Sequence, residues 1–422
     1  MRTPVPDPVR TLPESPDLRH LKDQARELLL AGGARKLSEA QFRLAREYGF
    51  ASWPKLKAQV ESLGRNGQLK AAIDANDLAG VQRLMTLHPE LHHAPLGYAK
   101  NGPLTWAAEC RVPREAPGEA RLAIARWMLD NGSDIHQGGD GPLMRAALDD
   151  QRIAMMELLV EYGADVNALW NGSYPIVCAP CEALAPAALR WLLAHGADPH
   201  RISAKYGSPL SMVFGTYSRS SEGKRGCLEA FVDAGFDLPD TPIVAFHRGR
   251  VDLLEQSLRK DPTLLGRRFS VAEIYPPDLG FEGSLAPDDG LHLTPIAGVT
   301  LLHLAVEYDE MEVLRWLLDR GAEVDARAEV DADGFGGHTP LFHAAVTMGR
   351  RDHEKARLLL DRGADPNARA TLRKQLRHMG DAEMEKMHEF HNVTPTEYAR
   401  QFHVQNWVSE PALAAIAEAG GA

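Results

Sequence analysis

Cysteine and long apolar runs are scarce in this sequence of 422 residues. The four cysteines, Cys110, Cys178, Cys181 and Cys227, are too few and too dispersed for a disulfide framework. The longest apolar runs are well short of the roughly 18 residues that suggest a membrane helix. Residues 1–17 carry prolines and acids where a secretory signal needs an apolar segment. We therefore expect a reducing, cytoplasmic location and no contact with a membrane.

The sequence also lacks a surplus of basic residues, and it lacks recognisable catalytic motifs. The formal net charge is −11, with 25% charged and 44% hydrophobic residues. This composition describes a folded, mildly acidic protein and disfavours bulk binding of nucleic acid. No nucleophile-and-base pairing, phosphate-cradling glycine loop or paired-carboxylate site is visible as a motif. We expect no enzymatic activity and no cofactor.

What the sequence does contain is a repeat, and its clearest copy is TLLHLAVEYDEMEVLRWLLDRGAEVDA at residues 300–326. Its leucine and alanine positions follow helical spacing in two successive segments. Weaker copies recur at a period of about 33 residues, with one insertion at residues 111–119. These copies begin near Pro103, Pro142, Pro175 and Pro209.

The unit resembles an ankyrin repeat, in which a Thr-Pro-Leu start opens one helix and Leu-Leu before Gly-Ala-Asp closes a second. The resemblance implies an all-α ankyrin-repeat solenoid, a curved stack of helix pairs with finger hairpins. About six pairs fit residues 65–266 and about three fit residues 300–422. We expect no sheet beyond the fingers and a helix content well over a third.

A different pattern precedes the repeats. Residues 1–17 are rich in proline, which predicts a flexible lead-in. Residues 18–64 show helical spacing without repeat signatures, and they resemble a short helical module that precedes the repeats in a group of bacterial ankyrin proteins. We expect Trp53, Leu56 and Val60 to pack on the first repeat pair, so that the module acts as a cap. The alternative is a detachable, weakly basic binding module.

Three segments break the repeat period, and such departures are where function tends to lie. The first is an inserted loop at residues 267–299. The second is a long finger that begins at residue 329, and the third, residues 372–392, predicts a charged helical insertion before the last repeat. Because the fingers of successive units line up along one edge of a solenoid, we expect the first two departures to form one composite site.

This composite site predicts a scaffold that binds a protein or peptide through its fingers and concave face. Aromatic side chains would anchor the partner, and acidic side chains would form a rim for basic groups. The residues assigned to the site are Tyr275, Phe281, Asp288, Asp289, Asp331, Asp333, Phe335 and His338. The alternative is that the two loops only cover each other's apolar surface. We expect the scaffold to be monomeric.

An enzyme or metal-dependent site in the same loops is the competing interpretation. The string VDADGFGGH has two close acids but lacks the glutamate that completes a calcium loop. His303, His338 and His343 would suit zinc if they gathered, although a histidine at the position of His303 commonly bonds the adjacent turn. Cys178 and Cys181 form a CxxC string inside a repeat helix, which disfavours a redox role. We therefore predict no metal site.

Overall fold

The computed structural model describes residues 10–13, 16–96, 101–137, 141–203, 206–280, 292–376 and 386–421. Helices make up 53% of the structure, and the described strands form only two short antiparallel pairs. The predicted all-α class and the helix content above a third are confirmed. Within the described ranges, every helix is too short or too polar to span a bilayer.

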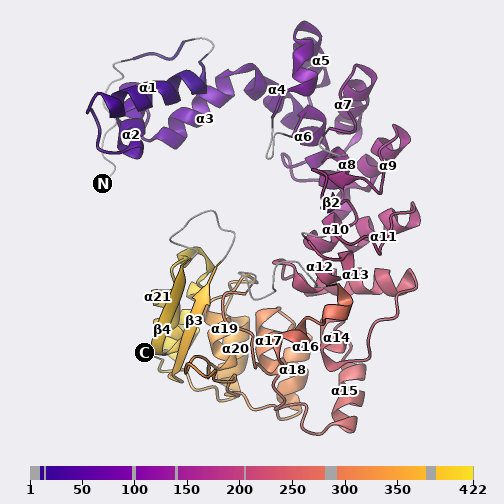
Figure 1. The fold of residues 1–422 in the computed structure, drawn as a ribbon, viewed down its shortest axis with the longest axis vertical. Coiled ribbons are helices and arrows are strands. Elements are labelled where there is room, and N and C mark those ends of the chain that lie inside the picture. Colours follow the sequence, from indigo (N-terminus) through magenta and orange to yellow (C-terminus); the bar gives the residue numbers. More distant parts are fainter. Residues whose placement is uncertain are drawn as a thin grey trace. The chain divides into compact units, whose positions relative to one another are not determined.

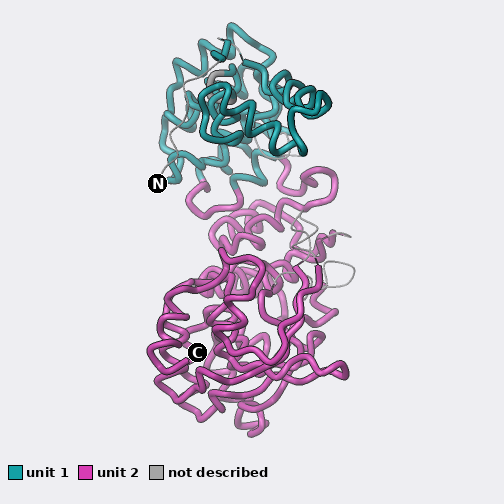
Figure 2. The backbone as a smooth tube through the Cα atoms, turned by 90° about the vertical axis from the view of Figure 1, so that its left-hand side faces the viewer, with its two compact units in different colours: residues 1–146, 154–164 teal, residues 147–153, 165–422 magenta. Residues whose placement is uncertain are grey.

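The chain divides into two compact units (Figure 2). Unit 1 comprises residues 1–146 and 154–164, and unit 2 comprises residues 147–153 and 165–422. Along the described chain, nine helix pairs follow the N-terminal helices, with α16 between the sixth and the seventh. Figure 1 labels these helices except α22. Short 3-10 helices lie at Pro89–His93, Asp150–Arg152, Pro277–Leu279 and Gln405–Trp407.

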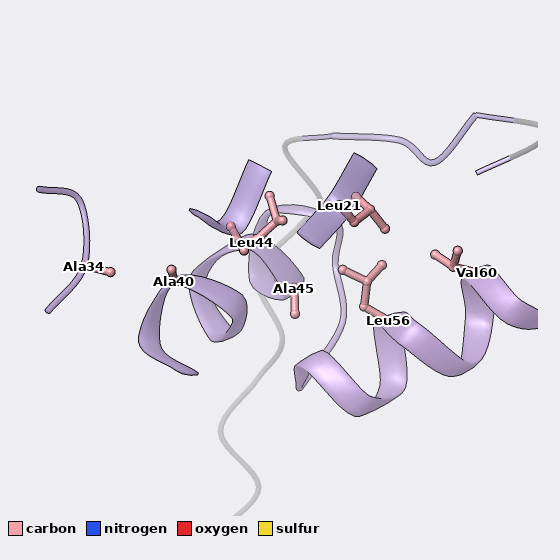
Figure 3. Close-up of a cluster of buried hydrophobic side chains, with 8 residues drawn as sticks. Leu21, Ala34, Ala40, Leu44, Ala45, Leu56 and Val60 are labelled. Carbon is pink, nitrogen blue, oxygen red and sulfur yellow. The ribbon is translucent and has the colours of Figure 1, made fainter. Parts of the chain in front are cut away.

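The N-terminal module of unit 1 has an apolar core of its own. It consists of α1 (Leu18–Leu30), α2 (Leu37–Glu47) and α3 (Trp53–Leu63). Figure 3 shows Leu21, Leu44, Leu56 and Val60 among the side chains of this core, and Trp53 packs against it. Trp53, Leu56 and Val60 thus find apolar partners in α1 and α2, and packing of the module on the first repeat pair stays a prediction.

The repeats of unit 1 begin directly after the module, since Gly64 alone separates α3 from α4. The pairs are α4 (Arg65–Asp74) with α5 (Leu78–Leu87), α6 (Pro103–Glu109) with α7 (Glu119–Asp130), and α8 (Gly141–Ala146) with α9 (Ile153–Glu161). The insertion between α6 and α7 is anchored by Arg121, whose buried guanidinium donates to Asn76 Oδ1 at 2.6 Å and to the Val112 carbonyl at 2.8 Å.

Unit 2 contains the remaining pairs. They are α10 (Cys178–Ala183) with α11 (Pro186–Ala194), α12 (Pro209–Gly215) with α13 (Ser221–Asp233), α14 (Pro242–His247) with α15 (Val251–Lys260), α17 (Leu301–Glu307) with α18 (Met311–Asp319), α19 (Pro340–Ala345) with α20 (Glu354–Asp361), and α21 (Pro395–Gln401) with α22 (Glu410–Glu418). Several first helices open on proline, which suits the first turn because its missing N–H has no helical partner there. Thr241 and Thr394 complete two of these starts as side-chain N-caps.

The four cysteines are buried, and none of them forms a disulfide. Cys178 and Cys181 lie in α10, as their position in the repeat predicts. Burial raises the pKa of the Cys178 thiol to about 12 and raises that of Cys181 well above its ordinary value. Both thiols therefore stay protonated and unreactive at neutral pH.

The strands lie in two fingers. One pair joins β1 (Leu169–Trp170) to β2 (Tyr174–Pro175). The other joins β3 (Ala370–Gln375) to β4 (Met387–Val393) (Figure 1). In this pair, Leu372 lies opposite Phe390. These strands correct the predicted charged helix at residues 372–392 for the part that the structure describes, and residues 377–385 lie outside the described residues. Alternate residues of β3 are buried, so a period of two, typical of a strand, governs the segment.

The inserted loop is ordered in its described parts, residues 267–280 and 292–299. A capping box between Ser270 and Glu273 starts the short helix α16 (Val271–Ile274). Backbone hydrogen bonds join Phe269 to Val299 and Gly298 and close the base of the loop. The loop thus returns the chain to the start of α17 next to the point where it left the repeat.

Candidate functional site

The three departures from the repeat period meet around one pocket of unit 2, with a volume of about 420 Å³. We call it the finger–hairpin pocket. The inserted loop supplies Pro295, Ala297 and Gly298, the finger supplies Glu329, Asp331, Phe335, Gly336 and His338, and the β3–β4 hairpin supplies Arg373, Lys374, Gln375 and Met387. The structure thus brings together three of the eight residues assigned to the composite site and adds the hairpin as a third wall.

Two glycines allow the walls to approach one another. Gly298 and Gly336 adopt φ values of +65° and +130°, which favour glycine. The Gly298 carbonyl accepts from the N–H of Glu329 at 2.9 Å, and Gly336 donates to the Thr371 carbonyl of β3 at 2.6 Å. A Cβ atom at Gly336 would lie 2.0 Å from the Glu329 carbonyl oxygen. A larger residue there would force apart the two sides of the finger, which pair at Val330 and Gly336.

The acidic side chains of the finger are already paired within the chain. Arg373 of β3 donates to Asp331 at 2.7 Å and to Asp333 at 3.0 Å. Its guanidinium carbon lies 4.7 Å from the centre of the Phe335 ring, in cation–π geometry. Arg373 thus already pairs with Asp331 and Asp333, and their expected rim contact with basic groups of a partner stays a prediction.

The three histidines considered for zinc do gather, with ring centres 5.3–5.8 Å apart. His303 uses both ring nitrogens: Nδ1 bonds Thr300 at the start of α17, and Nε2 bonds the His338 carbonyl at 3.1 Å. His303 therefore fixes adjacent turns, the structural role that its repeat position predicts. Within the described part of the chain, no three or more histidine, cysteine, aspartate or glutamate side chains are arranged to hold a metal ion.

Next to the histidines lies a buried polar group that we call the Glu307 cluster. It comprises Arg219, Tyr275, His292, Glu307, Tyr308 and His343. Glu307 accepts from Arg219 at 2.9 Å, from His292 Nδ1 at 3.0 Å and from His343 Nδ1 at 2.9 Å. Burial alone would raise the pKa of Glu307, but these hydrogen bonds and the charge of Arg219 outweigh it and hold that pKa well below its usual range.

The cluster also fixes the position of Tyr275. This residue is only 3% exposed, and its hydroxyl lies 2.5 Å from His292 Nε2 and contacts the Tyr308 hydroxyl. Tyr275 is therefore not a surface anchor in this structure, which corrects its assignment to the partner-binding site. The other three assigned residues of the loop, Phe281, Asp288 and Asp289, lie outside the described residues.

A buried lysine borders the same cluster. Lys224 of α13 is 1% exposed, and its Nζ lies 3.3 Å from His247 Nδ1 and 3.8 Å from the centre of the Tyr308 ring. Burial and the nearby charge of Arg219 lower the pKa of Lys224 to about 7. Lys224 and the ionisable groups of the Glu307 cluster are thus all shielded from solvent.

Sequence reasoning missed two sets of residues. The hairpin wall with Arg373 and Met387 was not predicted, because the charged segment at residues 372–392 was assigned to a helix. The alternating pattern in ATLRKQ could have indicated a strand. Arg219 and His292 gave no signal, because residues so distant in sequence meet only when the repeats stack. Glu307, the one acidic residue of the helix LLHLAVE, was the one local sign of that cluster.

Consecutive pairs of short helices joined by finger loops define an ankyrin-repeat fold. Comparison with family models supports this class directly: residues 138–171 match an ankyrin repeat, and residues 284–370 match the model of three ankyrin-repeat copies. The chain therefore contains ankyrin repeats. Neither match includes the N-terminal module. A comparison with curated proteins found no match.

Proposed function

We propose that this protein is a non-catalytic scaffold of the bacterial cytoplasm that binds a protein partner at the finger–hairpin pocket. The meeting of three irregular segments at one pocket carries the proposal, because regular repeats need none of them to stack. Ankyrin repeats hold partners against surfaces built from their fingers and helices. The mildly acidic composition supports a protein rather than a nucleic acid as the partner.

The chemistry of the pocket suits a short segment of a partner chain. A volume of about 420 Å³ accommodates one or two side chains and not a folded domain. Phe335 is half-buried, and Met387 is 52% exposed, so each offers apolar surface to a ligand. Aromatic and methionine side chains are enriched in the buried centres of interfaces.

A catalytic role has less support. The Glu307 cluster contains the residue types of an acid–base site, but its side chains contact one another and are buried. A group that acts on a substrate must come within hydrogen-bond reach of it. We propose that the cluster serves to hold the inserted loop, through Tyr275 and His292, against α17 and α19. A hydrolytic activity lost in a folded Glu307→Gln variant would instead favour an enzyme.

Affinity capture from the native cytoplasm tests the proposed function. The wild type is compared with a Phe335→Ala, Asp333→Ala double variant and with Phe42→Ala, which removes a half-exposed aromatic side chain from α2. We expect the double variant to lose a partner that the wild type and Phe42→Ala retain, with an unchanged melting temperature. Identical partners for all three proteins would contradict binding at this pocket.

A further inference from the structure

His338, on one wall of the finger–hairpin pocket, has an unused hydrogen-bond acceptor. His338 Nε2 lies 2.9 Å from the Pro295 carbonyl oxygen, which can only accept, so Nε2 carries the proton. Nδ1 of this neutral imidazole then carries a lone pair that can accept a hydrogen bond. The His338 side chain is 1% exposed and lines the pocket, and its Nδ1 has no hydrogen-bond partner in the described structure. A buried acceptor without a donor costs free energy that a ligand can recover.

A carboxylate lies on the same pocket wall. Glu329 is exposed and lines the pocket, and no ion pair or hydrogen bond of its side chain is formed with the described residues. Its backbone is fixed, since its N–H donates to the Gly298 carbonyl and a Cβ atom at Gly298 would lie 2.2 Å from Glu329 Cβ. Glu329 therefore adds a negative charge at a defined place in the pocket.

The cations of the pocket are engaged by the protein itself. Arg373 is bound to Asp331 and Asp333, and Lys374 is 4% exposed and has contacts of its own. Neither offers an open positive charge to an anionic ligand. The groups left for a ligand are thus an imidazole lone pair and a carboxylate, with the apolar surfaces of Phe335 and Met387 beside them.

We propose that the pocket binds a lysine or arginine side chain of the partner protein. Its N–H groups would meet His338 Nδ1 and the Glu329 carboxylate, and its methylenes would lie against Phe335 and Met387. An anionic side chain would be repelled by Glu329, and an apolar one would leave the imidazole unpaired. This inference rests on the proposed function and moves the recognition of basic groups from Asp331 and Asp333 to Glu329 and His338.

Peptide selection supplies the test without a known partner. Random 12-residue peptides displayed on phage are selected against the full-length wild type, with elution by excess soluble wild-type protein. The selected peptide is then synthesised in four forms, with lysine, arginine, norleucine or glutamate at its most enriched position. Fluorescence anisotropy gives the dissociation constant of each form.

Glu329→Gln removes the proposed charge and keeps the shape of the side chain. Glu323→Gln is the matched control, because Glu323 is also exposed but does not line the pocket. Losing one charge-assisted hydrogen bond should weaken binding of the basic peptide to Glu329→Gln about tenfold. Binding to Glu323→Gln, which keeps that bond, should be unchanged. The norleucine form should bind the wild type more weakly than the basic form binds Glu329→Gln, because it makes neither hydrogen bond. Histidine 15N spectra should show the His338 Nδ1 resonance moving when the basic peptide binds.

The outcomes separate the two proposals. Peptides that bind the pocket, lose affinity in Phe335→Ala and still tolerate norleucine would overturn the basic-side-chain inference and leave the scaffold function standing. A preference for the glutamate form, or an unmoved His338 Nδ1 resonance, would also overturn the inference. Failure to enrich any peptide that depends on Phe335 would count against both. The lysine and arginine forms show which basic group the pocket prefers.

Discussion

Two buried regions of this protein are stabilised in opposite ways. The core of the α1–α3 module consists only of apolar side chains, grouped around Leu56. The Glu307 cluster of unit 2 instead buries a carboxylate, a guanidinium and two imidazoles, each within hydrogen-bond reach of another. Apolar packing is non-directional and tolerates volume-conserving changes. A buried polar network depends on every member, because the loss of one leaves another unpaired.

The largest effect should come from breaking the polar cluster. Glu307→Ala leaves the buried Arg219 without its counter-charge and two histidines without their acceptor. We expect unit 2 to lose about 3–5 kcal/mol of unfolding free energy. Urea unfolding measures this loss. Glu312→Ala, which removes an exposed carboxylate from α18, should change stability little, and equal effects for the two variants would contradict the comparison.

Truncation of the apolar core should have a somewhat smaller and local effect. Leu56 is fully buried, and Leu56→Ala removes its contacts with α1 and α2. Such changes cost about 2–5 kcal/mol, and less where the site can collapse. Hydrogen exchange of the α1–α3 amides should accelerate while that of α17 and α19 stays unchanged. A Leu56→Met variant, which conserves volume, should keep most of the stability.

Acid should destabilise the polar region before the apolar one. Burial lowers the pKa of His292 to about 4 and that of His303 to about 3, so the unfolded chain binds their protons first. Between about pH 6.5 and 4, the unfolding free energy should therefore fall by up to about 1.4 kcal/mol per pH unit for each histidine. The stability of unit 2 should be highest above this window. A flat profile from pH 7 to 4.5 in urea titrations would show that these pKa values are not depressed.

The smallest expected effect is on the rate of proteolysis at the connection between the module and the repeats. We propose that residues 18–63 cap the repeats and do not form a detachable module. Gly64 alone separates α3 from α4, and Arg65 pairs with Glu90 at 3.1 Å. Limited trypsin digestion of the folded protein should therefore cut slowly at Arg65. Rapid cleavage that releases an intact repeat region would support the detachable alternative.

The sequence predicts the helix pairs well because their signals are local. Proline at Pro209 or Pro340 marks the start of a first helix, and Gly-Ala-Asp marks the end of a second. The β3–β4 hairpin was missed for a physical reason: Arg373 is paired with acids of the distant finger, and Lys374 is buried. Charge density alone does not separate a solvated helix from such a strand.

The candidate site was predictable only in part. The finger residues Asp331, Phe335 and His338 do line the pocket, because a long finger must lie at the edge of its repeat. The ion pair of Asp331 was not predicted, since its partner Arg373 lies far along the chain. The unpaired nitrogen of His338 follows from the position of the Pro295 carbonyl, and no sequence pattern specifies that.

The protected thiols of α10 and its neighbours have a practical consequence. Because all four native cysteines are buried, the folded protein should react only slowly with maleimide reagents. A cysteine introduced in place of the exposed Met387 would then be the one rapidly labelled position, without prior removal of the native thiols. A dye at that position would report directly on occupancy of the adjoining pocket. The slow labelling of the remaining thiols would measure the rate at which the helix pairs that enclose them open.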